Sequence, residues 1–544
     1  MSLRTTSSGR PAEWQAILII LALFAVSLAI REPVLNRPLA GNQEWLTSTV
    51  LRTMEIWQAD GAIHGQQLLP SMTYPGAANR FIPNHANLIA PNGECYYTSY
   101  PSLGYYVPYF VTSIIGMGPS VTFMRVFCLC VHLICVLLVF ALVRVATRPW
   151  NPFSAELAAI AAAGLYIFAT GTLWYHGNVY MSDMLVQMFF LAGTLLGLRL
   201  LRTVPGRVVD FIFVWVIIFA MTLTEWIGGL FAISLAIAAF RAAGWRRGIV
   251  ITLLAGTASG LAVAATVLHY SSIDGFANLV ESLRVKAEIY SAAANTTGTP
   301  AVISPKRWLL FARHYFDSYA GFACAIAALS GFIVLSFRKQ LTTFTRRAWA
   351  DSDFVSVVWL LAAPILLHHF ILFNWTTSHS FSVLKTAPLI ALVFGVLVLW
   401  VLEGSREKGW TCGLPLVVAI FLMGVASSIF MYFHSNLVHD ENYRASGNAI
   451  QRGTGEDEIA FVSVGRMSPR RDLYWQVHPQ LVFYAKRNLA VWLDGPEASR
   501  LLNTVGIQRG VLFTLTPDWQ IIDVRRFNLG EVNDIDRWLR ESGR

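Results

Sequence analysis

Charged residues are scarce in this chain. Asp, Glu, Lys and Arg together make up 13% of its 544 residues, whereas 55% of the residues are hydrophobic and the mean hydropathy is +0.52. Soluble globular proteins carry charge on about 25% of their residues. The shortage of charge therefore argues against a soluble protein of this size and predicts a polytopic membrane protein.

The sequence also lacks the short motifs that bind metals and nucleotides. It has no HExxH, CxxC or EF-hand pattern, and no Walker or dinucleotide-binding glycine motif. Five of the six cysteines fall in or beside apolar segments and Cys95 stands alone outside them, so we expect no disulfide framework. Soluble nucleotides are not expected as partners, and an energy source outside the cell has to be something else, such as an activated lipid.

Nucleic acid is not expected as a partner either, although the formal net charge is +9. The basic residues stand in short clusters between hydrophobic runs, which is how the orientation of a membrane protein is encoded. No separate basic domain is present in the sequence.

Long apolar runs follow one another along most of the chain. Trp14 to Ile30 could pass for a signal peptide, but no small-residue cleavage pattern follows it, so we expect it to remain as the first span. Further runs that are long enough to cross the roughly 30 Å of bilayer hydrocarbon lie near residues 120–143, 154–175, 180–198, 208–224, 226–240, 249–269, 318–337, 354–373, 381–402 and 411–433. The predicted fold is mainly α, with about eleven transmembrane helices. The two runs that flank Glu225 are the shortest.

Clusters of basic residues fall in alternate loops of this arrangement. They are Arg144 and Arg148; Arg199, Arg202 and Arg207; Arg241, Arg246 and Arg247; Arg338, Lys339, Arg346 and Arg347; and Arg406 and Lys408. Because basic loops stay in the cytoplasm, we expect the N-terminus inside. The 31–119 loop, the 271–316 loop and the C-terminal tail are then outside.

The first external loop, about residues 31–119, is the longest polar segment between two spans. Trp45, Met54 and Trp57 recur among polar residues such as Glu44 and Arg52 at a spacing that predicts an amphipathic helix lying along the membrane surface. Six tyrosines follow between residues 96 and 109. Such rings suit the boundary between lipid and water. We therefore expect a structured loop above a cavity within the membrane.

The composition changes after His434. Strand-like runs (459–464, 481–484, 511–515 and 521–524) alternate with helix-like runs (497–505 and 532–541). We predict a transmembrane domain over residues 1–433 and a small extracytoplasmic α/β domain over residues 434–544.

Ionisable side chains lie near the outer ends of several predicted spans. Each costs about 2.5 to 3.5 kcal/mol at the centre of a membrane helix, so such residues are functional candidates by default. The candidates are Arg125, Asp183, Glu225, His368, His369, His379 and Lys385. All are expected on the same side as the 31–119 loop, where they would line a polar cavity roofed by that loop.

Each candidate also has a structural interpretation. Asp183 could cap the helix that begins beside it, because Asp favours that position. Lys385, about one turn into its span, could extend its amine to the interface. Glu44 could be a solvated charge on the surface helix.

The same holds for the remaining candidates. His368 and His369 could pack or form hydrogen bonds without touching a ligand. Glu225 could pair with Arg125 or with Lys385, which would be a structural role.

Several of these segments together resemble the GT-C glycosyltransferases. They are the acidic residue soon after the first span, the tyrosine-rich segment 96–109, the helix that opens with Arg125, and Met181-Ser182-Asp183-Met184-Leu185 at the start of a span. Residues 478–487, HPQLVFYAKR, are similar to the start of the outer domain in bacterial members related to the dolichyl-phosphate-mannose and aminoarabinose transferases. The resemblance covers nearly the whole chain in layout and short patches in sequence.

The resemblance implies a bacterial inner-membrane enzyme that transfers a sugar from a polyprenyl-phosphate donor to an acceptor, usually with inversion. The acceptor could be a lipid, a glycan or a protein, and membrane lipids are further partners. A carboxylate acts as general base, a role for Glu44 or Asp183. Cationic groups stabilise the departing phosphate, a role for Lys385 together with Arg125 or His379. No cofactor is implied, and the need for a divalent cation is left open.

One position departs from the family pattern. Many members carry an Asp-Glu pair in the first external loop, with the Asp as base, whereas this chain has Gln43-Glu44. Gln43 cannot usefully accept a proton, so either Glu44, Asp183 or another acid takes over, or the reaction is altered or lost.

Three other classes of function stay open. A polysaccharide ligase or polymerase would carry its large loop late in the chain. A transporter would place interrupted spans in related halves and binding groups near the midplane. A non-catalytic scaffold with a carbohydrate-binding outer domain is compatible with Gln43, because a shared layout does not establish activity.

Overall fold

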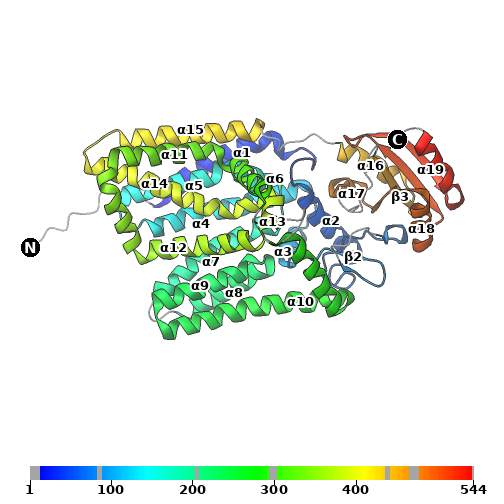
Figure 1. The fold of residues 1–544 in the computed structure, drawn as a ribbon, viewed down its shortest axis with the longest axis horizontal. Helices are drawn as coiled ribbons and strands as arrows, with labels where there is room; N and C mark the ends of the chain where they lie inside the picture. Colours follow the sequence, from blue (N-terminus) through cyan, green and yellow to red (C-terminus); the bar gives the residue numbers. More distant parts are fainter. Residues whose placement is uncertain are drawn as a thin grey trace, which may run out of the picture.

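Twelve apolar helices form an elongated bundle in which most axes run roughly side by side (Figure 1). The computed structural model describes residues 13–81, 88–202, 207–291, 293, 300, 302, 304–434, 442–464 and 477–541. The bundle helices are α1 (Glu13–Leu35), α4 (Val121–Ala146), α5 (Pro152–Phe168), α6 (Thr170–Asn178), α7 (Ser182–Arg202), α8 (Val208–Thr224), α9 (Ile227–Ala243), α10 (Trp245–Tyr290), α11 (Pro305–Ala350), α12 (Ser352–Ile371), α14 (Ala387–Glu407) and α15 (Gly413–His434).

Each apolar run that was predicted as a span is largely helical in this bundle. Among the described residues, eight helices are long and apolar enough to cross a membrane, and α5 with α6 can form a ninth span bent by 59°. The short helices α8 and α9 flank Glu225. The mainly helical, polytopic fold predicted from the sequence is therefore confirmed.

Two helices extend well beyond the apolar runs that predicted them. α10 continues past a break at Asp274 and Gly275 as far as Tyr290, and α11 already begins at Pro305. Much of the 271–316 segment, predicted as a loop, is therefore helical. Hydropathy marks only the part of a helix that lies in lipid, so it misses polar continuations of this kind.

The segment between α1 and α4, predicted as the first external loop and called so below, forms a folded layer at one end of the bundle (Figure 1). It contains α2 (Trp45–Asp60), η1 (Ala77–Asn79), the hairpin of β1 (Leu88–Ile89) and β2 (Cys95–Tyr96), and α3 (Leu103–Ile114).

Helix α2 differs from the surface helix that its pattern predicts. All residues from Leu46 to Met54 are buried, and so are Ile56 and Trp57. Its polar side faces protein, since Arg52 Nη2 donates a 2.5 Å hydrogen bond to Asn488 Oδ1 of the C-terminal region. The amphipathic pattern thus reflects packing between two parts of the protein instead of contact with a lipid surface.

The C-terminal region is a small α/β unit beyond the same end of the bundle (Figure 1). It contains α16 (Tyr443–Gly453), β3 (Glu458–Val464), α17 (Pro479–Ala485), β4 (Leu489–Val491), α18 (Gly495–Val505), β5 (Arg509–Leu515), β6 (Ile521–Asn528), η5 (Leu529–Glu531) and α19 (Val532–Glu541). The sheet has the order β4-β3-β5-β6, with β3 parallel to both neighbours and β5 antiparallel to β6.

Most elements of this unit agree with the sequence prediction, but the predicted strand 481–484 is wrong. That run belongs to α17, in which Pro479 occupies the first turn and all seven residues are buried. A short, fully buried apolar run shows no periodicity that separates a strand from a helix. Proline at the first helical position is the signal that favours a helix here.

Three of the predicted site residues lie at breaks between bundle helices. Asp183 follows the gap between α6 and α7, and Glu225 is an extended residue between α8 and α9. Lys385 lies in η3 (Ser380–Thr386), which links α13 (Phe373–Ser378) to α14. Irregular backbone at membrane depth is tolerated where it is buried in protein or lines a cavity. These breaks therefore mark the place to look for a site.

Candidate functional site

Two buried carboxylates share one lysine at the end of the bundle that the sequence predicts to face outward. Lys385 Nζ forms an ion pair with Asp183 Oδ1 and lies 3.9 Å from Glu225 Oε1. The same Glu225 oxygen lies 3.1 Å from Nε2 of His368. These four side chains, at most 3% exposed, are called the acid–lysine cluster. Their contacts join α7, the link between α8 and α9, and α12 to η3.

Tyr100 extends the acid–lysine cluster toward the first external loop. Its hydroxyl donates a 2.8 Å hydrogen bond to Asp183 Oδ2. Burial, reinforced by the Asp183 carboxylate, raises the pKa of Tyr100 well above its ordinary value, so this phenol stays protonated and donates. Both oxygens of Asp183 are therefore engaged, one by a lysine and one by a tyrosine.

His369 points to a second set of polar groups beside the cluster. Its Nε2 lies 3.0 Å from Tyr315 Oη and 3.3 Å from Thr386 Oγ1. The Nδ1 atoms of His368 and His369 are buried without a hydrogen-bond partner in the part of the chain that the structure describes. Both histidines thus keep one ring nitrogen that further polar groups can satisfy.

A cavity of about 170 Å³ adjoins the acid–lysine cluster. It is lined by Ser99, Tyr100, Glu225, Trp226, Leu283, Lys286, Ala287, Tyr290, Leu372 and Trp375. Glu225 and Tyr100 thus face the cavity, whereas Asp183 and Lys385 are not among its lining residues. We call it the reaction cavity below.

Lys286 is a functional candidate that the sequence did not reveal. Its side chain is buried, and its Nζ donates a 3.0 Å hydrogen bond to Thr98 Oγ1. Within the described residues it has no carboxylate partner. A buried ammonium without a counter-ion is costly, and one on a cavity wall is well placed to bind an anion. Lys286 follows Leu279 and Leu283 at helical spacing, and this pattern could have placed it on the same helix face. The pattern was missed because the segment was predicted as a loop.

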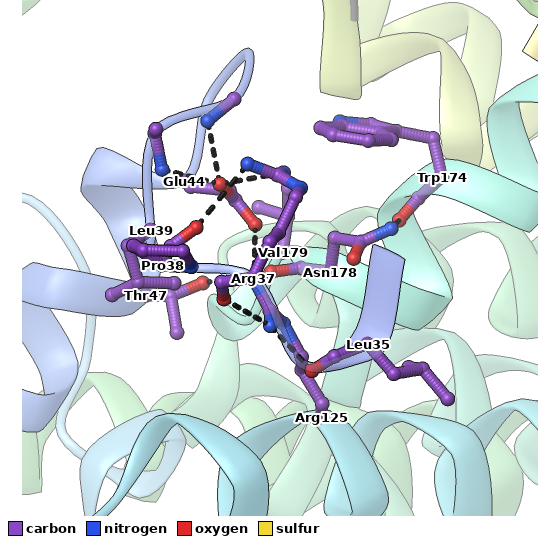
Figure 2. A network of polar contacts seen from close by, with 12 residues as sticks. Leu35, Arg37, Pro38, Leu39, Glu44, Thr47, Arg125, Trp174, Asn178 and Val179 are labelled. Carbon is purple, nitrogen blue, oxygen red and sulfur yellow. Dashed lines mark hydrogen bonds and ion pairs between the residues drawn. The ribbon is translucent and has the colours of Figure 1, made fainter. Parts of the chain in front are cut away.

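Glu44 and Arg125 meet in a different cluster (Figure 2). Glu44 Oε1 accepts a 3.0 Å hydrogen bond from Arg125 Nη2, and Oε2 lies 2.8 Å from Arg37 Nη2. The backbone N–H groups of Ala40 and Gly41 donate to Oε2 at 2.8 and 2.6 Å. Within the described residues, Glu44, Arg37 and Arg125 form a Glu44–arginine cluster that has no hydrogen bond or ion pair to the acid–lysine cluster.

Arg125 also ties the start of the first loop to α4. Its Nη1 donates to the carbonyl oxygens of Leu35 and Arg37 at 2.5 and 2.6 Å (Figure 2). Arg37 lies over the ring of Trp174, 5.1 Å from its centroid. The Glu44–arginine cluster therefore fixes the path of the chain from α1 to α2.

Gln43 and His379 both contact Trp45. Gln43 has a positive φ of 64°, and its Oε1 accepts a 2.8 Å hydrogen bond from Trp45 Nε1. His379 stacks on Trp375 with 3.7 Å between ring centroids and also contacts the ring of Trp45. Because Trp375 lines the reaction cavity and His379 does not, the Trp375 ring separates His379 from this cavity.

The predicted site residues thus separate into two groups. Asp183, Glu225, His368, His369 and Lys385 come together beside the reaction cavity. Glu44 and Arg125 form the other cluster. Within the described residues no three His, Cys, Asp or Glu side chains converge in a way that could hold a metal ion.

Sequence comparisons find no relative for this chain. No family model matches it, and no curated protein matches it.

Comparison of folds finds clear neighbours among solved structures. The oligosaccharyltransferase of Archaeoglobus fulgidus in the apo form superposes with a TM-score of 0.58 at 12% identity, over 92% of this chain and 70% of that chain. ArnT from Cupriavidus metallidurans in the apo state gives a TM-score of 0.51 at 12% identity, over 93% of both chains. ArnT bound to undecaprenyl phosphate gives 0.50 at 13% identity, also over 93% of both chains.

This chain has the GT-C fold. The fold that the sequence resemblance implied is thereby confirmed. At this level of identity the likeness concerns the GT-C fold alone, and the chemistry rests on the residues described above.

Proposed function

We propose that this GT-C protein transfers a sugar from a polyprenyl-phosphate donor to an acceptor at the outer face of the membrane, with inversion at the anomeric carbon. The observation that carries the proposal is the reaction cavity, in which a carboxylate (Glu225) and a lysine (Lys286) share the wall. Two structural neighbours support the donor class by what they bind, namely dolichol-phosphate in the archaeal enzyme and undecaprenyl phosphate in ArnT.

The chemistry needs a base for the acceptor and positive charge for the leaving group. The acceptor oxygen attacks the anomeric carbon, the bond from that carbon to the phosphate oxygen breaks, and the acceptor proton passes to a carboxylate. The lipid phosphate leaves with the bonding electrons and is stabilised by a cation. Because only groups on the cavity wall can touch substrate, we assign Glu225 as base and Lys286 to the phosphate.

The remaining members of the acid–lysine cluster hold these groups in place. Asp183 binds both Lys385 and Tyr100, and Lys385 lies between two carboxylates. Lys385 is thus already compensated by negative charge, so it is less suited to a phosphate than Lys286. In this proposal Asp183 and Lys385, which the sequence assigned to base and phosphate, are positioning residues.

Transfer assays on single variants test this assignment. Purified protein is supplied with a panel of polyprenyl-phosphate sugars and extracted cell-envelope acceptors. We expect Glu225→Gln to lower transfer roughly 10²- to 10⁴-fold, the usual contribution of a general base. We expect Lys286→Met to lower it roughly 10²- to 10³-fold, because it removes charge from the leaving phosphate.

Matched controls separate this effect from general damage. Glu281→Gln and Lys306→Met change exposed residues of α10 and α11 and should retain normal transfer. If Asp183→Asn abolishes transfer while Glu225→Gln does not, Asp183 is the base. If the unmodified protein transfers no sugar from any donor, the scaffold interpretation that Gln43 leaves open takes precedence.

A further inference from the structure

A second, polar cavity lies where the helix bundle, the first external loop and the C-terminal unit meet. Its volume is about 360 Å³. The lining residues are Leu35, Asn36, Arg37, Pro38, Glu55, Pro119, Ser120, Val121, Thr122, Arg125, Arg444, Asn448, Phe483, Tyr484 and Lys486. None of these lines the reaction cavity. We call this space the junction cavity.

Positive charge dominates the wall of the junction cavity. Arg37, Arg125, Arg444 and Lys486 line it, and Glu55 is its one acidic lining residue. Glu55 pairs with Lys486. No other carboxylate among the lining residues is left to balance the positive charge of the three arginines.

The Glu44 carboxylate compensates only part of this charge. It carries one negative charge against the two guanidinium groups of Arg37 and Arg125. Arg125 is 2% exposed, and its Nε has no hydrogen-bond partner within the described part of the chain. Arg444 on α16 forms no ion pair with any described residue. A buried, unpaired guanidinium N–H on a cavity wall calls for an acceptor.

The N-terminus of a helix adds to the positive potential in the junction cavity. The N-cap Ser120 and the first residues of the 26-residue helix α4, Val121 and Thr122, line the cavity. The N-terminal end of a helix carries partial positive charge and free N–H groups, which favour phosphate and other anions.

The position of the cavity fits a ligand that reaches it from the membrane boundary. Leu35 is the last residue of α1, and Val121 is the first residue of α4. The cavity therefore lies level with the ends of two spans, where lipid headgroups are found. It is also much larger than one phosphate ion, so it has room for an attached glycerol or sugar.

We propose that the junction cavity binds a phosphate-bearing anion, with Arg125, Arg444 and the start of α4 as its principal contacts. Because its walls come from the bundle and from the C-terminal unit, the bound anion would join the two. The site is separate from the reaction cavity. Arg125, which the sequence assigned to the donor phosphate, belongs to this second site instead.

Binding measurements on full-length protein test the proposal without any transfer assay. The probes are phosphatidylglycerol and zwitterionic phosphatidylcholine, added in mixed micelles, and glycerol 3-phosphate in solution. Binding is followed as a concentration-dependent rise of Tm, since a ligand of the folded state stabilises it by mass action. Arg444→Gln should weaken binding roughly tenfold, the loss expected for one charge-assisted hydrogen bond.

Two further variants on the same wall and helix sharpen the test. Glu55→Gln removes the carboxylate that competes for Lys486, so it should tighten binding several-fold. Arg452→Gln changes another exposed arginine of α16 that does not line the cavity, and should leave binding unchanged. Opposite effects of Glu55→Gln and Arg444→Gln cannot arise from general destabilisation.

The probes also identify the source of the anion. Stabilisation by phosphatidylglycerol alone indicates a lipid headgroup, and stabilisation by glycerol 3-phosphate as well indicates a site open to soluble phosphates. The proposal is overturned if neither probe raises Tm beyond phosphatidylcholine, or if Arg444→Gln responds like Arg452→Gln. Neither result bears on transfer, so this site and the proposed function can fail independently.

Discussion

Glu44 illustrates how a buried acid can serve the fold. Its carboxylate is fully buried and meets two arginines and two backbone N–H groups. A base must offer an oxygen to substrate, and Glu44, unlike Glu225, lines neither of the two cavities described above. Glu44 therefore closes the turn between α1 and α2 and compensates part of the positive charge of Arg37 and Arg125.

We expect Glu44→Gln to unfold more readily than the wild-type protein. Removing one partner of a buried ion pair leaves the other charge uncompensated, at a cost of about 3–5 kcal/mol. Thermal unfolding in detergent measures the effect. Glu32→Gln, an exposed acid on α1, is the control and should leave Tm unchanged. A normal Tm combined with lost transfer would instead support the base role that the sequence allowed for Glu44.

The sequence could identify single residues of the site and, for Glu225, Lys385 as one possible partner, but not the other contacts. The rarity of ionisable groups in apolar runs was enough to select Asp183, Glu225 and Lys385. Their contact depends on packing between segments 202 positions apart for Asp183 and Lys385, which no local pattern encodes. Lys286 was missed because the polar continuation of α10 has no hydropathy signal.

At the scale of elements, breaks between helices position the chemistry. Asp183 stands at the start of α7, and Glu225 between α8 and α9 accepts a 2.9 Å hydrogen bond from Ile227 N. The sequence indicated these breaks by the shortness of the runs around Glu225. Periodicity could not indicate α17 as a helix, because a buried run of seven residues carries no period, and Pro479 at its start was the signal that the prediction overlooked.

A close contact between α3 and α7 supports the position of Asp183. A methyl group added at Gly104 of α3 would overlap the side chain of Ser182, the first residue of α7. Gly104→Ala should therefore displace this end of α7, lower stability by about 1–3 kcal/mol and reduce transfer. The measurements are Tm and initial transfer rate.

A second substitution distinguishes this contact from a general effect of alanine. In the double variant Gly104→Ala with Ser182→Gly, α3 gains a methyl group and α7 loses the side chain that this methyl group would overlap. The double variant should therefore regain most of the lost stability. Gly256→Ala on α10 adds a methyl group where no neighbour lies within 4 Å, so it should not destabilise the protein. An equal loss in all three variants would contradict the proposed contact.

The whole molecule has two chemically distinct ends. Residues of the predicted basic clusters contact the ends of other helices or the loops beside them: Arg202 pairs with Asp353, Arg347 donates to the Pro149 carbonyl, and Lys408 donates to the Ser336 carbonyl. The first external loop and the C-terminal unit gather at the opposite end (Figure 1). The sequence predicted that the basic loops and the long polar segments lie at opposite ends, because the charge of a loop is a local property of the sequence. It could not predict that α2 is buried between two units, because that burial depends on the assembled fold.

The last prediction concerns which end faces the cytoplasm. Basic loops are retained inside, so alkaline phosphatase fused after Arg544 should be active and a fluorescent protein there dark. The same reporters inserted after Lys408, in a basic loop, should give the reverse pattern and serve as the control. If both fusions report the opposite sides, the reaction cavity faces the cytoplasm. Soluble nucleotide sugars would then be available to the cavity. The lack of nucleotides outside would no longer argue for a polyprenyl-phosphate donor.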